Sequence, residues 1–461
     1  MAETKVKDLT VGSPLKLILS FTIPIFLGMM FQQFYSVVDT MIVGQTLGVE
    51  ALAAVGATGS ITFLIIGFCN GIASGFAIPV AQRFGAKDEK GLKLAIANGV
   101  YLGIGFSVVI TLLVTMLCRS ILEFLNTPAD IIDGAYAYLI VVLWGIPVIF
   151  FYNFFSGIMR SLGDSKTPVY FLVLASIINI VLDYVFILGL GTGVEGAAYA
   201  TVISQFVAAV LSGIFMIKKY AVVHMTKYER RRDSHCMLQL LYMGIPMGLQ
   251  YSITAIGSVI LQTAVNELGS NAVASITTGG KIACFFLVLF DALGSTMATY
   301  GGQNVGAKKL DRVSKGLFIA CAIGVIYSIF AGAVLAMFGD KFALLFVDAK
   351  ETELIANVST YLKIESGFYC LLTLVNCIRF MIQGMGFSFL AVIAGIMEMI
   401  ARAFVALVLV PNFGFAGACL ASPVAWILAD AFLIPAFFYV RKNLQRHFDR
   451  SNDKMVNTEA S

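Results

Sequence analysis

Long apolar segments separated by short polar loops run through the entire chain. A helix needs roughly 20 mostly apolar residues to cross the hydrocarbon core of a bilayer, and each segment reaches about that length. No loop between them approaches the size of a soluble sensor or receptor domain. The pattern predicts twelve transmembrane helices, near residues 15–44, 52–80, 94–118, 131–158, 168–190, 196–217, 238–264, 273–298, 313–338, 354–378, 388–410 and 416–440. The expected fold class is therefore an all-α polytopic membrane protein.

The composition agrees with a protein that lies within a membrane. Of the 461 residues, 59% are hydrophobic and 13% are charged, and the mean hydropathy is +0.89. A soluble domain carries about 25% charged residues. The eight cysteines form no CxxC motif and no cluster with histidine, so neither a zinc site nor a disulfide framework is indicated. The sequence also lacks a Walker motif and a nucleophile or metal constellation, which argues against an ATPase and against an intramembrane enzyme.

The distribution of basic residues predicts the orientation of the helices. With the N-terminus in the cytoplasm, most of the 31 Lys and Arg fall on the inner side, and the longest loop, 218–236, is strongly basic. The outer loops hold only Arg119, Lys341 and Lys350. The positive-inside rule therefore predicts that both termini are cytoplasmic. The net charge of +4 has this topological meaning, and we do not expect nucleic-acid binding.

The two halves of the chain repeat the same sequence features. Matching positions, displaced by 221 to 223 residues, are Pro24 and Pro246, Leu47-Gly48 and Leu268-Gly269, Gln82 and Gln303, Asn153 and Asn376, Gly163 and Gly386, and Gly196-Ala197 and Gly417-Ala418. Because each half has six helices, both halves begin on the same side of the membrane. We therefore expect two six-helix bundles related by a pseudo-two-fold axis along the membrane normal. The predicted parts are an N-lobe (1–217), a cytoplasmic linker (218–237), a C-lobe (238–440) and a cytoplasmic tail (441–461).

Two carboxylates lie within the predicted helices of the first half. Asp39 belongs to a long apolar segment that also contains Pro24, and Asp183 lies in segment 168–190 with Asn179 four residues earlier on the same helical face. A charge inside hydrocarbon costs about 3 kcal/mol or more, so such residues are functional-site hypotheses by default. The alternative for Asp39 is a position at the level of the lipid headgroups.

These polar residues share a similar depth in the membrane. Asp39 and Asp183 fall in the outer part of their helices, and Thr201 lies at a comparable level in the returning segment 196–217. This depth is compatible with one shared site. Carboxylate, amide and hydroxyl oxygens suit Na⁺ by the rules for hard cations, whereas two close carboxylates would share a proton. The residues leave both ions open.

The second half carries a different set of polar residues. Segment 388–410 contains Glu398 and Arg402, four residues apart, which we interpret as an ion pair on one helical face. Asp291 is either a second cation or substrate carboxylate, or a group whose field is partly neutralised by Lys281. The candidate polar site of the C-lobe comprises Gln250, Lys281, Asp291, Glu398 and Arg402, and Asp430 carries a weaker signal.

Several motifs together resemble the multidrug and toxic compound extrusion (MATE) transporters. They are VVDTMIVGQTLG around Asp39, ALAAVGA at 51–57, NIVLDY at 179–184, GAAYAT at 196–201, and QxxGAK at 82–87 and 303–308. The resemblance covers essentially the whole chain. It implies efflux of cationic or amphipathic compounds in exchange for H⁺ or Na⁺ across the cytoplasmic membrane of a prokaryote, with no other cofactor. It also implies a bending proline at Pro24 and a cation site at Asp39, Asn153, Asn179, Asp183 and Thr201.

One departure from the family pattern indicates which branch of the family the chain resembles. NorM-like members have acidic residues in the seventh and tenth helices. Here the seventh helix offers neutral groups such as Gln250 and Thr254, and the tenth has only Glu365, beside Lys363. The pattern favours the DinF-like branch and weakens the case for a cation site in the C-lobe.

The mechanism that fits these features is a rocker-switch antiporter. Each charge moved down a potential of about 100 mV provides roughly 2.3 kcal/mol. We expect a monomer without enzymatic activity, in contact with membrane lipids and small organic substrates. The alternative within the same superfamily is a flippase for lipid-linked saccharides, which commonly has extra helices and a cationic cavity. Twelve helices and acidic residues in the first half favour efflux.

Overall fold

The computed structural model describes residues 7–125, 127–226 and 229–459, and these residues form helices and loops without any strand. Ten helical stretches of this described part are long and apolar enough to cross a membrane, and two bent helix pairs raise the number to twelve. The predicted all-α fold class is confirmed. In chain order the helices are α1 (Pro14–Leu47), α2 (Val49–Ala57), α3 (Gly59–Gly85), α4 (Glu89–Phe124), α5 (Ile132–Trp144), α6 (Ile146–Ser161), α7 (Thr167–Asp183), η1 (Tyr184–Gly189), α8 (Val194–Lys219), η2 (Ala221–Val223), α9 (Ser234–Glu267), α10 (Ser270–Gly306), α11 (Leu310–Ala343), α12 (Thr352–Gly367), α13 (Tyr369–Gly384), α14 (Ser388–Phe404), η3 (Val405–Leu409), α15 (Val410–Cys419) and α16 (Ala421–Glu459).

The chain forms two compact units. The first consists mainly of Ile23–Phe84 and Asp88–Ser252, and the second mainly of Leu9–Thr22 and the chain from Ile253 onward. Two long helices, α1 and α9, therefore begin in one unit and end in the other. The functional division into lobes at 1–217 and 238–440 stays a prediction.

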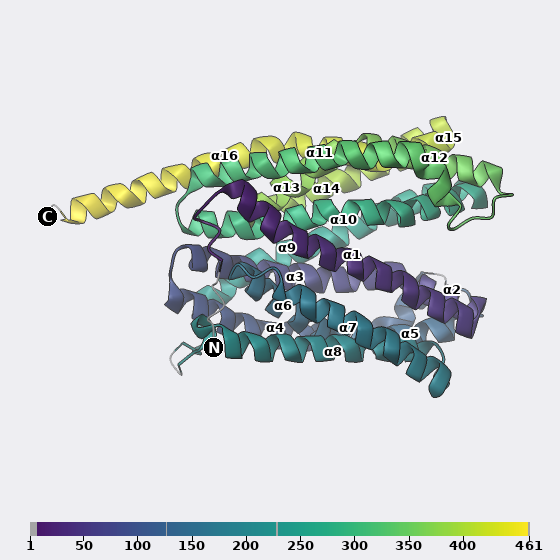
Figure 1. The fold of residues 1–461 in the computed structure, drawn as a ribbon, viewed down its shortest axis with the longest axis horizontal. Coiled ribbons are helices and arrows are strands. Elements are labelled where there is room, and N and C mark those ends of the chain that lie inside the picture. The colour runs from purple at the N-terminus through teal and green to yellow at the C-terminus, as the bar shows by residue number, and fades with distance from the viewer. Residues whose placement is uncertain (1–6, 126, 227–228, 460–461) are drawn as a thin grey trace. The chain divides into compact units, whose positions relative to one another are not determined.

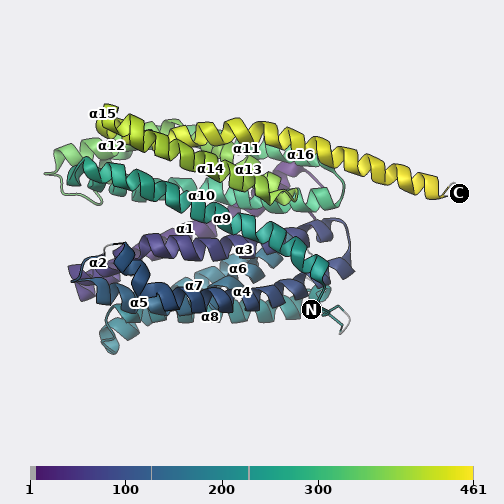
Figure 2. The same cartoon turned by 180° about the vertical axis from the view of Figure 1, so that it is seen from behind.

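Each unit is built from long helices that lie alongside one another. In the first unit α8 packs against both α6 and α7 (Figure 1). In the second unit α16 packs against α13 and α14 (Figure 2). Helices pack in this way when each presents an apolar surface along its length, as the hydropathy of these segments predicts.

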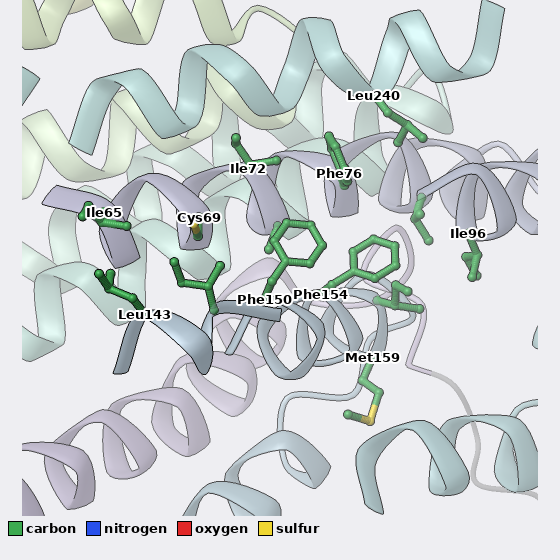
Figure 3. Packing of buried hydrophobic residues seen from close by; sticks show 14 of the residues in the cluster. Ile65, Cys69, Ile72, Phe76, Ile96, Leu143, Phe150, Phe154, Met159 and Leu240 are labelled. Carbon is green, nitrogen blue, oxygen red and sulfur yellow. The ribbon is translucent and has the colours of Figure 1, made fainter. Parts of the chain in front are cut away.

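A cluster of aromatic rings fills the centre of the first unit. Phe76 on α3 faces Phe150 and Phe154 on α6, and all three side chains are fully buried (Figure 3). The centroid of the Phe76 ring lies 6.1 Å from that of Phe150 and 6.3 Å from that of Phe154, with nearly perpendicular ring planes. Edge-to-face pairs of this kind add about 0.5–1.5 kcal/mol to the burial of each ring. The cluster fixes α6 against α3.

The repeated QxxGAK motif forms the same helix end in both halves of the chain. Lys87 and Lys308 adopt the left-handed backbone conformation, each with φ of 58°. The backbone N–H of Asp88 then donates to the carbonyl of Arg83 at 2.9 Å, and that of Lys309 donates to the carbonyl of Asn304 at 2.8 Å. These bonds satisfy carbonyls that a helix leaves free at its end. The sequence repeat thus reflects a repeated helix stop.

Two irregularities recur in the two halves of the chain. The pair α5 and α6 is bent by 46°, and the corresponding pair α12 and α13 by 50°. Both segments were predicted as single helices, and Pro147 in the first turn of α6 explains the first break. A π-helix also follows α7, as η1, and α14, as η3. Such π-turns are frequent at functional sites.

The backbones of α3 and α9 approach each other closely in the first unit. Each helix carries a pair of glycines four residues apart, Gly71 and Gly75 on α3 and Gly244 and Gly248 on α9. A methyl group added to Gly75 would lie 2.5 Å from the Cα of Gly244, and one added to Gly71 would lie 2.5 Å from the carbonyl oxygen of Met247. Small residues at this spacing allow tight helix contacts in membranes.

We expect Gly75→Val to destabilise the protein by about 1–3 kcal/mol, because the new side chain must push apart two backbones. Thermal unfolding of the purified protein measures the effect as a lower Tm. Gly105→Val on α4 is the matched control, since an added Cβ there meets no atom within 4 Å. Equal Tm values for the two variants would show that the close approach is unimportant.

The predicted linker folds against α4 in the first unit. The side chain of Asn98 donates to the carbonyl of Arg231 at 3.2 Å and accepts from the N–H of Asp233 at 3.0 Å. Asn98 is fully buried by this contact. Nearby, the backbone N–H of Thr226 donates to Glu229 at 2.7 Å and holds the pKa of that carboxyl below its usual range. The described part of the linker is thus held in place by specific bonds.

Candidate cation site

The structure brings the two carboxylates of the first half together. Asp183, the last residue of α7, is fully buried, and Asp39 on α1 is half-buried. Their carboxyl groups lie close enough to interact directly. Two ionised carboxylates repel each other in a low-dielectric interior, so the pair is stable only when a proton or a cation neutralises part of the charge.

The oxygens of this pair lack donors. Within the described chain, Oδ1 of Asp39, both carboxylate oxygens of Asp183 and Oδ1 of Asn179 are buried without a hydrogen-bond partner. Buried polar atoms are nearly always paired in folded proteins, so a group of unpaired acceptors calls for an explanation. Oxygens that gather without donors match what a proton or a hard cation requires.

Asn179 and Thr201 lie beside each other, as their depth predicted. The Asn179 amide donates to the Thr201 hydroxyl at 3.4 Å, and this hydroxyl donates to the carbonyl of Ala197 at 3.0 Å. Asn153 has a different partner, because its amide donates to Oδ1 of Asn70 at 2.9 Å. Its predicted place near the cation site stays a prediction.

Two tyrosines that the sequence analysis missed also surround the carboxylates. Tyr35 on α1 and Tyr138 on α5 both lie within the electrostatic range of Asp39 and Asp183. Tyr35 precedes Asp39 by four residues and shares its helical face, so the spacing of polar residues on α1 could have identified it. Nothing in the sequence around Tyr138 indicates its position.

The helix geometry places Asp183 at a structural transition. The regular α-helix ends at this residue, and the π-helix η1 begins with Tyr184. A π-turn accommodates an extra residue per turn and rotates the following side chains relative to an α-helix. The last α-helical turn therefore carries both Asn179 and Asp183 into the site.

The second unit corrects the predicted ion pair. Glu398 on α14 pairs with Arg379 on α13, and both side chains are buried. Arg402 instead donates to the carbonyl of Thr254 at 3.1 Å and to the hydroxyl of Ser258 at 3.5 Å. The predicted pair of Glu398 with Arg402 is therefore wrong, because packing of α13 against α14 brings a nearer guanidinium to the carboxylate.

Asp291 also differs from its predicted surroundings. It accepts a hydrogen bond from the Asn376 amide at 3.3 Å, and the charge that acts on it comes from Arg379 rather than from Lys281. Lys281 is exposed on α10, ten residues before Asp291 and therefore about 15 Å, nearly three helical turns, away along the helix axis. Gln250 belongs to the first unit. The C-lobe polar site of these five residues stays a prediction.

One pair of side chains repeats between the units with a change of charge. Asn153 bonds to Asn70 in the first unit, and the equivalent Asn376 bonds to Asp291 in the second. The same contact joins two amides in one half and an amide with a carboxylate in the other.

Comparison with known proteins agrees with this architecture. The sequence model described as MatE matches residues 24–185 and again residues 246–408, so the two matches begin 222 residues apart. The "Probable multidrug resistance protein YoeA" of Bacillus subtilis (strain 168) is 30% identical over 73% of this chain and 74% of its own length. The "Probable multidrug resistance protein YpnP" of the same organism is 31% identical over 79% of this chain and 81% of its own length.

A solved structure described as the "Outward-facing conformation of a multidrug resistance MATE family transporter of the MOP superfamily" is also similar. Its TM-score is 0.89 at 25% identity, with 97% of this chain and 99% of that chain covered. The family match in both halves, the relatives at 30% identity or more and the shared fold lead to one conclusion: the chain belongs to the MATE family of membrane transporters.

Proposed function

We propose that this protein is a multidrug efflux antiporter, which exports cationic or amphipathic organic compounds in exchange for H⁺ or Na⁺. The observation that carries the proposal is the pair Asp39 and Asp183, whose buried oxygens lack donors in the described chain. Such a pair binds a cation or a proton when it is accessible from outside and releases it when it is accessible from the cytoplasm. The two similar proteins of Bacillus subtilis, both named as multidrug resistance proteins, support the substrate class.

In this proposal Asp39 and Asp183 carry the ion, and the other groups position them. Asn179 and Thr201 supply neutral oxygens, as a hard cation prefers, and Asn153 contributes from α6. The contact between Asp39 and the fully buried Asp183 favours an ion site over a headgroup position for Asp39. The proposal includes a monomer in the cytoplasmic membrane with both termini on the cytoplasmic side.

The proposed hinge of this rocker switch is Pro24. Proline removes one helical hydrogen bond, here the one that the carbonyl of Ser20 would accept, and weakens the helix locally. Helix α1 passes from the second unit to the first between Thr22 and Ile23, just before Pro24. In this proposal a motion of one unit relative to the other therefore bends α1 at Pro24, where the helix is weakest.

The alternative function is a flippase for lipid-linked saccharides. Its cavity would need a surplus of cationic groups to hold the phosphates of such substrates. The first unit instead offers a pair of carboxylates. The names of the relatives also favour efflux of drugs.

Uptake of a fluorescent organic cation into proteoliposomes tests the proposal. We expect accumulation under an imposed H⁺ gradient or an imposed Na⁺ gradient, and the effective gradient identifies the coupling ion. Protein-free liposomes under the same gradients are the control. If neither gradient drives uptake of any cation while a labelled lipid-linked saccharide binds, the flippase is the better description.

A further inference from the structure

Three carboxylates lie near a single guanidinium in the second unit. Arg379 on α13 pairs with Glu398 on α14, and its charge also acts on Asp291 on α10 and Asp430 on α16. If all four groups were ionised, two negative charges would remain uncompensated. Asp291 accepts a hydrogen bond from the Asn376 amide, so it has a donor that stabilises its charge.

Asp430 has no such compensation. Its side chain is 4% exposed, and both of its carboxylate oxygens are buried without a hydrogen-bond partner in the described chain. An ionised carboxylate in this position is costly, since neither water nor a donor replaces its lost hydration. The cost disappears when the group carries a proton.

Among the neighbours of Asp430, Arg379 is the charged group that acts on its carboxyl. Within the described chain α16 packs mainly against α13 and α14, with smaller contacts to α15 and η3. From α13, Arg379 and the buried thiol of Cys377 face Asp430. On α14, Glu398 is engaged with Arg379, and Arg402 is turned to Thr254. On α15, Cys419 lies near Glu365 instead.

We propose that Asp430 is a proton-binding site of the second unit, which holds a proton while Arg379 is engaged by Glu398 and releases it when the guanidinium turns toward Asp430. The step moves one proton and breaks no covalent bond. The carboxyl O–H of Asp430 gives its proton to water. The resulting carboxylate is then stabilised by the Arg379 guanidinium, whose contact with Glu398 weakens.

A proton fits this site better than a metal ion. A hard cation needs several oxygen ligands, and the adjacent guanidinium repels it. No group of three or more His, Cys, Asp or Glu side chains suited to a metal ion occurs in the part of the chain that the structure describes. The proposed function gives this site its role, as a second coupling site beside Asp39 and Asp183, but proton binding itself does not depend on that function.

The protein contains a built-in reporter for the test. Of its two tryptophans, Trp426 lies one helical turn before Asp430 on α16 and is 5% exposed. Its ring lies 6.1 Å from that of Tyr369. Trp144 is 58% exposed and belongs to the first unit, so Trp144→Phe gives a full-length protein with a single reporter beside Asp430.

The experiment is a pH titration of the fluorescence of the Trp144→Phe protein in lipid nanodiscs. We expect a single sigmoidal change in the Trp426 emission, which Asp430→Asn abolishes and which Asp430→Glu retains with a shifted midpoint. Asp39→Asn should keep the titration, so a failure of the antiport proposal and a failure of this one are distinguishable. Replacing choline chloride by NaCl at fixed pH should leave the emission unchanged.

Glu365→Gln is the matched control, because Glu365 is a buried carboxyl whose charge acts on Tyr369, the neighbour of Trp426. The titration should survive this change. The proposal is overturned if the emission does not titrate, if it titrates equally in Asp430→Asn, or if Glu365→Gln alone removes the change. An emission change caused by Na⁺ and lost in Asp430→Asn would overturn the proton as the ligand.

Discussion

Asp39→Asn and Asp183→Asn should each abolish gradient-driven accumulation of substrate while leaving the protein folded. The amide cannot ionise, so it neither attracts a cation nor takes up and releases a proton. One pH unit supplies about 1.4 kcal/mol per proton, enough for roughly tenfold accumulation in a one-for-one exchange. We expect the accumulation ratio to fall from that range to about one in either variant.

The two substitutions should not lower the stability of the protein at neutral pH. Each replaces one of two acidic groups that lie close together by a neutral amide, and this amide can still donate a hydrogen bond to the remaining carboxyl. Thermal unfolding therefore separates a loss of coupling from a loss of fold. Asp133→Asn is the matched control, since this carboxylate belongs to a surface ion pair with a side chain 82% exposed.

Uptake at the normal rate in both Asp39→Asn and Asp183→Asn would rule out this pair as the coupling site. Loss of uptake with a large fall in Tm would mean that the carboxylates are structural. Loss of uptake at an unchanged or higher Tm is the result that supports ion coupling at the pair.

The helices and the repeat could be predicted because their signals are local. A run of apolar residues indicates a membrane span whatever its packing partners are. The QxxGAK motif ends its own helix, because Lys87 and Lys308 adopt the left-handed backbone conformation. Several helices extend beyond the predicted segments, such as α10, which ends at Gly306 instead of 298, since polar residues continue a helix outside the hydrocarbon core. The predicted segment 416–440 does not fit this pattern, because α15 ends at Cys419 and α16 begins at Ala421. The bends between α5 and α6 and between α12 and α13 do not interrupt the apolar segments. The hydropathy of the sequence therefore could not reveal them.

The similar depth of Asp39 and Asp183 made a shared site compatible with the sequence, because depth along a helix is a one-dimensional property that sequence can supply. The sequence could not predict which partners tertiary packing would bring together. The spacing of four residues predicted that Glu398 pairs with Arg402, yet the residue that binds Glu398 is Arg379, on another helix. The buried position of Asp430 depends in the same way on how α16 packs against α13 and α14.

Arg379→Met should be strongly destabilising. It leaves Glu398 buried without its ion-pair partner and removes the positive charge that acts on Asp430. Breaking a buried pair from one side costs about 3–5 kcal/mol, because the remaining charge stays desolvated. We expect a correspondingly large fall in Tm in detergent or nanodiscs at neutral pH, and a smaller fall at acidic pH, where the carboxyls take up protons and no longer need a cation.

The double variant Arg379→Met with Glu398→Gln tests whether the loss comes from an unpaired charge. It should recover a large part of the Tm, since a buried amide costs far less than a buried carboxylate. Arg119→Met is the control, because Arg119 forms surface pairs with Glu123 and Asp133, whose loss changes stability by about 0–1 kcal/mol. If Arg379→Met is no less stable than Arg119→Met, the buried pair contributes little. A double variant that unfolds as readily as Arg379→Met would show instead that the packing of the arginine stem, rather than its charge, holds α13 against α14.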